Sequence, residues 1–172
     1  MKELVLFTEE ECNWLLDHAT DYRESTMSYG WNRTPELSNI KNERERISEQ
    51  CQLGQPEGAL KEFLLDKLKP LGFLNLEGTY LNYVKYYKGG FFTKHIDGPE
   101  RHKTCIIQLT PEQEYKGGNL IVRDKVIGKK IGTSVIFGSN VPHELTLVEE
   151  GHRDCLVVWT KKGNLIETNT LI

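Results

Sequence analysis

The sequence lacks long hydrophobic runs. Its longest apolar stretches, such as residues 135–137 and 156–159, are far shorter than the ~20 residues that a membrane-spanning helix needs. Residues 1–7 form too short an apolar block for a secretory signal and are followed by no small-residue cleavage site. We therefore expect a cytoplasmic protein with no membrane partner.

An excess of positive charge is also absent. The chain carries 22 Lys and Arg residues against 25 Asp and Glu residues, which gives a formal net charge of −3. Nucleic-acid binding depends largely on cationic side chains that release counterions from the phosphates. A nucleic-acid substrate is therefore disfavoured, although the arginines of residues 21–50 leave a local basic patch open.

Closely spaced cysteines are missing as well. Cys12, Cys51, Cys105 and Cys155 lie far apart in the sequence and form no Cys-x-x-Cys pair. This spacing suits neither a zinc ribbon nor a disulfide framework. Three of the four lie within apolar patterns, so we predict reduced cysteines buried in the core.

What the chain does contain is typical of one globular domain. Its 172 residues are 38% hydrophobic and 27% charged. Residues 8–11 form a capping box that predicts a helix start, and a second helix is predicted between Pro56 and Pro70. The apolar face of the first helix consists of Cys12, Leu15, Leu16 and Ala19. That of the second consists of Leu60, Phe63, Leu64 and Leu68.

The segment between the two predicted helices, residues 21–50, shows no clear period. It is rich in Arg, Glu, Asn and Ser and carries two isolated aromatic residues, Tyr29 and Trp31. A connection of this length in a compact domain is usually a functional lid or a disordered segment. Both a substrate lid and a solvated loop stay open.

From about residue 74, short runs of β-branched and aromatic residues alternate with glycine-containing turns. The sequence predicts strands at residues 80–87, 104–109, 119–123, 133–137, 144–148 and 153–160. No helical pattern separates them, which favours an antiparallel sandwich or small barrel. Helices first and strands after predict an α+β chain whose helices buttress one β-sheet.

Two residues in this β-rich part form half of a metal site. His95 and Asp97 follow a predicted strand, where alternation points both side chains to the same side. With five histidines in the chain, a chance His-x-Asp pair is easy to find, so a third ligand is needed. His143 would complete the two-His-one-carboxylate triad of iron(II) oxygenases. A structural zinc would need four closed ligands, and no cysteine is placed to supply the fourth.

The last predicted strand carries an unusual cation. Alternation places Arg153 on the same face as Cys155, Val157 and Trp159, which is an apolar face. If that face is the interior, an unpaired guanidinium there would be costly, so an anion is expected beside it. A dicarboxylate could bind iron at one end and Arg153 at the other. The alternative is an edge strand whose arginine points to water.

Several motifs in the β-rich part agree at once in order, spacing and residue type. They are Tyr86-x-x-Gly89-x-Phe91-Phe92-x-x-His95-x-Asp97, Arg101-x-x-Thr104, Gly117-Gly118-x-Leu120, Pro142-His143-Glu144, and Gly151-x-Arg153 with Trp159 six residues further on. This set resembles the prolyl-4-hydroxylase-like branch of the Fe(II)/2-oxoglutarate-dependent oxygenase superfamily. The resemblance covers about residues 80–159, and residues 7–12 are similar to the family's usual opening segment.

The resemblance implies a fold and a chemistry. The fold would be a double-stranded β-helix (jelly roll), with helical support over about residues 8–70 and the β-helix core over about residues 73–161 of a single domain. Iron(II) would bind His95, Asp97 and His143, and Arg153 would bind the distal carboxylate of 2-oxoglutarate. With O₂, the reaction would yield succinate, CO₂ and a hydroxylated substrate, with ascorbate as a possible supporting reductant. The presence of Asp97 favours hydroxylation over halogenation.

Other positions follow from the same resemblance. Tyr86 and Thr104 would line the cosubstrate pocket, with a core tyrosine as the plain alternative for Tyr86. Gln108 stands where many relatives have a tyrosine that helps to hold the distal carboxylate, which leaves the second contact to 2-oxoglutarate unassigned. Arg101, Trp31 and Tyr29 are candidate substrate contacts.

Three classes of function remain after these observations. The first is a hydroxylase that acts on a prolyl residue of a protein or peptide, or on a free amino acid or another small molecule. The second is a nucleic-acid demethylase on the same scaffold, which the acidic net charge of −3 disfavours. The third is a non-catalytic binding module, which nothing favours while all three candidate metal ligands are present.

Overall fold

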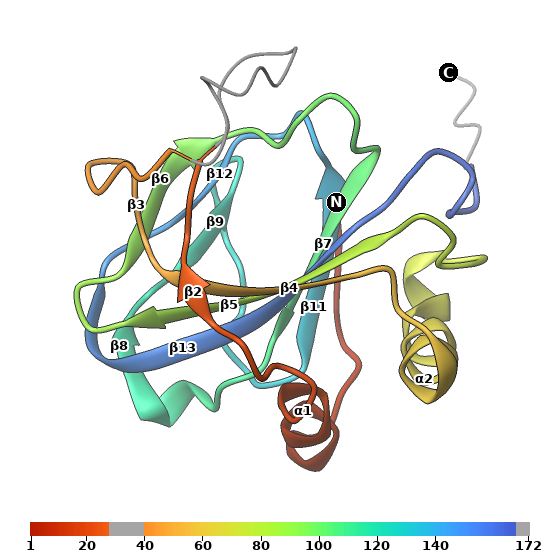
Figure 1. The fold of residues 1–172 in the computed structure, drawn as a ribbon, viewed down its shortest axis with the longest axis horizontal. Helices are drawn as coiled ribbons and strands as arrows, with labels where there is room; N and C mark the ends of the chain where they lie inside the picture. Colours follow the sequence, from red (N-terminus) through yellow and green to blue (C-terminus); the bar gives the residue numbers. More distant parts are fainter. Residues whose placement is uncertain (28–39, 168–172) are drawn as a thin grey trace.

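Two β-sheets dominate the computed structural model, which describes residues 1–27 and 40–167. Figure 1 shows the sheets facing each other, with the helices outside them. In chain order the elements are β1 (Lys2–Val5), α1 (Glu9–Leu16), β2 (Arg23–Glu24), β3 (Arg46–Ile47), β4 (Glu49–Gly54), α2 (Gly58–Leu68), β5 (Tyr80–Tyr87), β6 (Phe91–His95), β7 (Lys103–Gln108), β8 (Tyr115–Gly117), β9 (Leu120–Val122), β10 (Lys125–Val126), β11 (Thr133–Gly138), β12 (His143–Leu145) and β13 (Val148–Trp159). Short 3₁₀ turns lie at Lys69–Leu71 and Glu112–Glu114.

The two sheets form the double-stranded β-helix that the sequence predicted. Within the described ranges, the larger sheet has eight strands, in the order β1-β11-β7-β13-β5-β4-β2 with β8 paired to β13. The smaller sheet has five, in the order β10-β9-β12-β6-β3. Neighbouring strands pair antiparallel, as in the register of β13 with β5 and β7. The expected fold class is therefore confirmed.

The larger sheet has two apolar faces, because its strands alternate between two cores. One face packs on the helices through side chains such as Leu81, Ile107 and Leu156, together with Leu15 and Leu64 of the helices. The other face points toward the smaller sheet and contributes Val84, Tyr86, Ile106, Cys155 and Val157. The second face lines the space between the sheets, where the candidate site lies.

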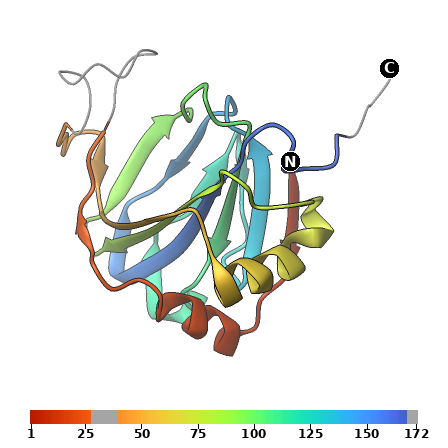
Figure 2. The same cartoon turned by 45° about the vertical axis from the view of Figure 1, so that its right-hand side comes forward.

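Both helices cover the outer face of the larger sheet, as Figure 2 shows from the side. Helix α1 begins at the predicted capping box, in which the Thr8 hydroxyl accepts from the backbone N–H of Glu11 and the Glu11 carboxylate accepts from that of Thr8. Helix α2 ends in a 3₁₀ turn closed by Gly72, whose φ is +93°. Among the residues that the structure describes, no helix is long and apolar enough to cross a membrane.

The structure differs from the sequence expectation before residue 74. There β1 forms an edge of the larger sheet beside β11, and β4 pairs with β5. Strands were expected only after the helices, because these early segments lack a strong period of their own. Their partners lie far along the chain, as Lys2 opposite Ile136 and Gln50 opposite Val84 show. Pairing with an existing sheet, rather than local propensity, makes them strands.

The segment 21–50 is accordingly more regular at its ends than predicted. Arg23–Glu24 pairs with β4, and Arg46–Ile47 extends the smaller sheet by pairing with β6. Residues 28–39 lie outside the described residues, and so do the two substrate candidates Tyr29 and Trp31. Whether this segment is a lid stays a prediction.

The cysteines have the state that their spacing predicted. Cys12, Cys51, Cys105 and Cys155 are all free and buried. Burial raises the pKa of the Cys12 thiol to about 12, with a smaller contribution from Glu11. These thiols are therefore packing side chains of the core.

Candidate metal centre

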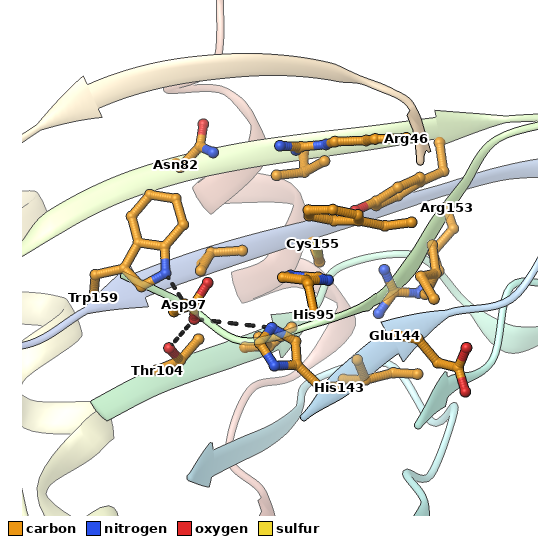
Figure 3. A pocket seen from close by; sticks show the side chains of 17 residues that line it. Arg46, Asn82, His95, Asp97, Thr104, His143, Glu144, Arg153, Cys155 and Trp159 are labelled. Carbon is orange, nitrogen blue, oxygen red and sulfur yellow. Dashed lines mark hydrogen bonds and ion pairs between the residues drawn. The ribbon is translucent and has the colours of Figure 1, made fainter. Parts of the chain in front are cut away.

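The space between the sheets holds a pocket whose walls come from both of them. Its polar lining includes His95 from β6, His143 from β12, Thr104 from β7 and Arg153 from β13, with Asp97 just after β6. Figure 3 shows these side chains turned toward one another inside the pocket. The strand that carries Arg153 is central in its sheet, so the alternative of an edge arginine in water is wrong.

His95, Asp97 and His143 come together as a triad that could hold a metal ion. Their candidate ligand atoms all lie within 4.8 Å of one another. Strand pairing brings this about, because His143 lies directly opposite His95 in the β6–β12 register. The backbone N–H of Asp97 donates to the carbonyl of Ser139, 2.9 Å away, which ties the loop after β6 to the loop before β12.

The two imidazoles are oriented as metal ligands. The Nδ1 atom of His95 lies 2.7 Å from the carbonyl of Thr93, and that of His143 lies 3.0 Å from the carbonyl of Val141. A carbonyl only accepts, so each Nδ1 carries the proton and each Nε2 keeps a free lone pair. The Nε2 of His143 lies 3.8 Å from the Asp97 carboxylate, on the side where the three ligands converge.

The electrostatics of His95 also suit a ligand. Burial, and after it the neighbouring His143, lower the pKa of His95 to about 4. The ring is therefore neutral at physiological pH, and a neutral imidazole is the form that binds a metal ion. Two imidazoles and one carboxylate are the donor set of iron(II) oxygenase sites, so the residues present fit iron(II).

Asp97 is held by three surrounding donors. The Thr104 hydroxyl and the indole N–H of Trp159 both donate to Oδ2, the latter over 3.3 Å. The Arg101 guanidinium lies 3.3 Å from Oδ1 and stacks on the Trp159 ring, with 3.6 Å between its carbon and the ring centroid. These contacts fix the direction of the carboxylate, which is the role of residues around metal ligands. Thr104 borders the pocket, as expected, but its visible contact is with Asp97.

Arg153 is a fully buried cation with unused donors. Its side chain is 1% exposed, and its Nε and one terminal nitrogen have no hydrogen-bond partner among the described residues. Burial alone would lower the pKa of Arg153. The neighbouring Cys155, Tyr115 and Tyr86 raise it by more than burial lowers it, so the guanidinium stays charged. An unpaired buried charge is costly, and a carboxylate would satisfy both the charge and the free donors.

Tyr86 forms one wall of the same end of the pocket. It lies opposite Arg153 in the β5–β13 register, and the Arg153 guanidinium carbon is 5.9 Å from the Tyr86 ring centroid. Burial raises the pKa of the Tyr86 hydroxyl, and Arg46 works against this rise. The phenol is therefore protonated and able to donate into the pocket.

Two residues beside Arg153 were not assigned from the sequence. The Tyr115 hydroxyl is buried without a well-formed hydrogen bond. Burial raises the pKa of Tyr115, and the charge of Arg153 is the main influence that lowers it. Lys129 lies 4.7 Å over the Tyr115 ring, and its pKa is lowered by burial and then by Arg153. Arg153 thus disfavours the charged form of Lys129, and an anion beside the two cations would favour it.

Gln108 was noted only as a departure from the resemblance. It is 2% exposed, and neither its Oε1 nor its Nε2 has a partner in the described part of the chain. Because it shares the inner face of β7 with Thr104 and Ile106, its amide belongs to the wall of the β-helix interior. The Gln108 amide, like the Tyr115 hydroxyl, is therefore a buried donor without a hydrogen-bond partner among the described residues.

The pair Gly117-Gly118 gives the signal that could have pointed to Tyr115. Gly118 has a φ of +56°, and a Cβ there would lie 3.4 Å from Cδ2 of Tyr115 and 3.5 Å from Cδ of Arg153. Glycine thus lets the backbone turn closely around this end of the pocket. The need for glycine at position 118 therefore indicates that Tyr115 and Arg153 lie close together.

Residues 81–161 match the family model described as the 2OG-Fe(II) oxygenase superfamily. Comparison with curated protein sequences gives no significant match.

The solved structures that resemble the chain include three prolyl hydroxylases. A Pseudomonas putida prolyl-4-hydroxylase has a TM-score of 0.68 at 18% identity, covering 94% of this chain and 92% of that one. A Trichoplax adhaerens prolyl hydroxylase, in complex with a hypoxia inducible factor oxygen degradation domain peptide fragment, has 0.60 at 20%, covering 87% and 73%. The viral collagen prolyl hydroxylase of Paramecium Bursaria Chlorella virus-1, in a 2OG complex, has 0.59 at 17%, covering 92% and 93%. At these identities the likeness shows a shared fold.

The matched residues contain all three members of the triad, and they also contain Arg153. The resemblance drawn from the sequence is thereby confirmed at the level of the superfamily, whose members use iron(II), 2-oxoglutarate and O₂. Over residues 81–161 this chain matches the 2OG-Fe(II) oxygenase superfamily, and it is a 2-oxoglutarate-dependent oxygenase.

Proposed function

We propose that this oxygenase hydroxylates an unactivated C–H bond, with a prolyl residue of a protein or peptide as its substrate. The observation that carries the proposal is the combination of the triad with an unpaired, fully buried arginine in one pocket. A metal-binding module would need the triad alone. The arginine adds a requirement for an anion at the opposite end of the pocket.

Each side chain has a part in this proposal. His95, Asp97 and His143 hold iron(II), and Arg153 binds the distal carboxylate of 2-oxoglutarate, assisted by Tyr115 and Gln108. Tyr86 and Thr104 line the pocket between these ends. Bound iron(II) supplies the oxidation in which 2-oxoglutarate and O₂ become succinate and CO₂ and the substrate gains a hydroxyl group. The carboxylate at Asp97 occupies the position that halogenating relatives leave free, which supports hydroxylation.

The choice of a prolyl substrate rests on the structural neighbours. All three relatives described above are prolyl hydroxylases, and the Trichoplax protein holds a peptide fragment. A free amino acid or another small molecule is the second candidate, and a polar, partly cationic outer cavity favours it. The net charge of −3 continues to disfavour a nucleic acid. A cytoplasmic location and support by ascorbate stay predictions.

Turnover of 2-oxoglutarate tests the function directly. Purified protein with iron(II), ascorbate and O₂ should form succinate slowly without substrate, and faster with lysate peptides that then gain one oxygen atom by mass spectrometry. His95→Ala should abolish succinate formation while the fold is retained, because a ligand is lost. A wild-type protein that forms no succinate, or a His95→Ala variant that forms it at the same rate, would refute the proposal.

A further inference from the structure

A second arginine approaches the metal site from the side of the smaller sheet. Arg46 of β3 has its guanidinium carbon 4.6 Å from the ring centroid of Phe92. The Phe92 ring in turn stacks on His95, with centroids 3.6 Å apart and planes at 16°. Figure 3 shows Arg46 above His95, and the Phe92 ring contacts both of these side chains. One aromatic ring, that of Phe92, therefore separates Arg46 from a candidate metal ligand.

The charge of Arg46 is not neutralised by the described protein. Its Nε donates to the Ser48 hydroxyl over 2.8 Å, and no carboxylate of residues 1–27 or 40–167 lies within ion-pair distance. Arg101, at the same opening, pairs with Asp97 and Glu100. A partly buried guanidinium without a counter-ion, pre-organised by stacking, is a binding site for a planar carboxylate.

Arg46 borders the space through which a substrate reaches the site. It lines both the inner pocket and an outer cavity of about 460 Å³ that also reaches His95 and Asp97. Among the described residues, the charged groups that line the outer cavity are Arg46, Arg101, Lys161, Asp97 and Glu100. Because Arg101 and the two carboxylates contact one another, Arg46 and Lys161 leave this cavity net positive. Such a cavity selects an anion.

A buried acceptor accompanies this cation. Asn82 is 1% exposed and borders the inner pocket together with Arg46. Its amide nitrogen donates to Gln50 over 3.4 Å, and its Oδ1 has no partner in the described ranges. An unsatisfied buried acceptor is destabilising until a donor reaches it. An N–H group on the substrate would be such a donor.

We propose that Arg46 binds a carboxylate of the substrate and that Asn82 accepts a hydrogen bond from an N–H group beside it. The inference rests on the proposed hydroxylase function and narrows its substrate to compounds with a carboxylate a few bonds from the oxidised carbon. A free amino acid carries both groups on one carbon. A peptide presents them when an acidic residue adjoins the prolyl residue.

Paired probes that differ only in this charge test the proposal. The probes are the common free amino acids with their carboxamides, and a capped Glu-Pro peptide with its Gln-Pro counterpart. Binding is measured by calorimetry without O₂, on protein loaded with iron(II) and 2-oxoglutarate, and turnover is followed as succinate above the substrate-free rate. We expect at least one acid to bind roughly 10- to 100-fold more tightly than its amide, the range for a charged hydrogen-bonded pair. If the preferred acid is a free amino acid, the carboxylate comes from a small molecule. If it is the Glu-Pro peptide, the carboxylate comes from an acidic residue of a peptide.

Three variants assign the preference to Arg46. In Arg46→Gln the ratio of acid to amide affinity should fall to about one, and Arg46→Lys should restore part of it because the charge returns without the planar fork. Comparing acid with amide in the same variant cancels any general damage to the site. The matched control is Arg44→Gln, an exposed arginine two residues away, which should keep the wild-type ratio.

The outcomes separate the two proposals. No acid-over-amide preference in any wild-type pair, or an unchanged preference in Arg46→Gln, overturns the role of Arg46. An acid preference that depends on Arg46, in a protein that forms no succinate, supports the carboxylate site and counts against the hydroxylase alone.

Discussion

Arg153 is a residue whose environment is unfavourable in the absence of a ligand. It is 1% exposed, charged, and short of hydrogen-bond partners, although it lies in the middle of the larger sheet. A protein gains no stability from such a group, because a buried charge must be compensated to be tolerated. Its place is explained if the compensation comes from the carboxylate of 2-oxoglutarate.

This explanation predicts an unusual effect for Arg153→Met. Without 2-oxoglutarate, the variant should be as stable as the wild type or more stable by up to about 4 kcal/mol, because apolar replacement of a buried ion is often neutral or stabilising. Addition of 2-oxoglutarate at roughly 100 times its Kd should stabilise the iron-loaded wild type by about 2.7 kcal/mol and leave the variant unchanged. Denaturation curves with and without 2-oxoglutarate measure both effects. A variant that is strongly destabilised yet still stabilised by 2-oxoglutarate contradicts the assignment.

The lowered pKa of His95 predicts how the metal-free protein responds to acid. Its pKa is about 4 when folded, mainly because of burial, against about 6.5 for an unfolded histidine. Between these values the unfolded state binds more protons, so stability is fully present above about pH 6.5 and is lost as the pH falls toward 4. Urea unfolding of chelator-treated protein at several pH values should show a slope of up to about 1.4 kcal/mol per pH unit from this group. His95→Gln should have a shallower slope, and equal slopes in the two proteins would show that His95 is not the group responsible.

At the scale of elements, sequence patterns correctly predicted the features that depend on residues close together in the chain. The capping box at Thr8 specified the start of α1, and the alternation in residues 153–159 correctly turned Arg153 to the interior. Strands β1, β3 and β4 were not foreseen, because their regular structure depends on partners far along the chain. Arg46 was not predicted as a pocket residue for the same reason, since only the pairing of β3 with β6 brings it over Phe92.

The capping box of α1 gives a prediction on stability alone. Thr8→Ala removes the hydroxyl that accepts from the backbone N–H of Glu11, so the free energy of unfolding should fall by about 0.5–2 kcal/mol. Thr8→Ser keeps an accepting hydroxyl and should stay within a few tenths of a kcal/mol of the wild type by the same rule. The helix lies on the outer face of the larger sheet, so the affinity for 2-oxoglutarate should not change. Equal unfolding free energies for the alanine and serine variants would show that the cap contributes nothing.

At the scale of the whole molecule, the core under the helices is separate from the core that surrounds the candidate site. One core lies between the helices and the larger sheet, and a second lies between the sheets around the candidate site. The metal ligands could be foreseen from residue type and spacing, because His95 and Asp97 are neighbours and His143 follows a turn. Tyr115 and Lys129 could not, since they meet Arg153 only through the closed architecture. The division into one domain stays a prediction.

The central claim is that one pocket holds iron(II) and 2-oxoglutarate together. Titration of the wild-type protein with both, in the absence of O₂, should produce the weak visible absorption of the iron–2-oxoglutarate chelate and saturate at one equivalent of each per chain. His143→Ala should lack this absorption because a metal ligand is missing. A wild-type protein that shows no absorption at saturating iron(II) and 2-oxoglutarate would contradict the account.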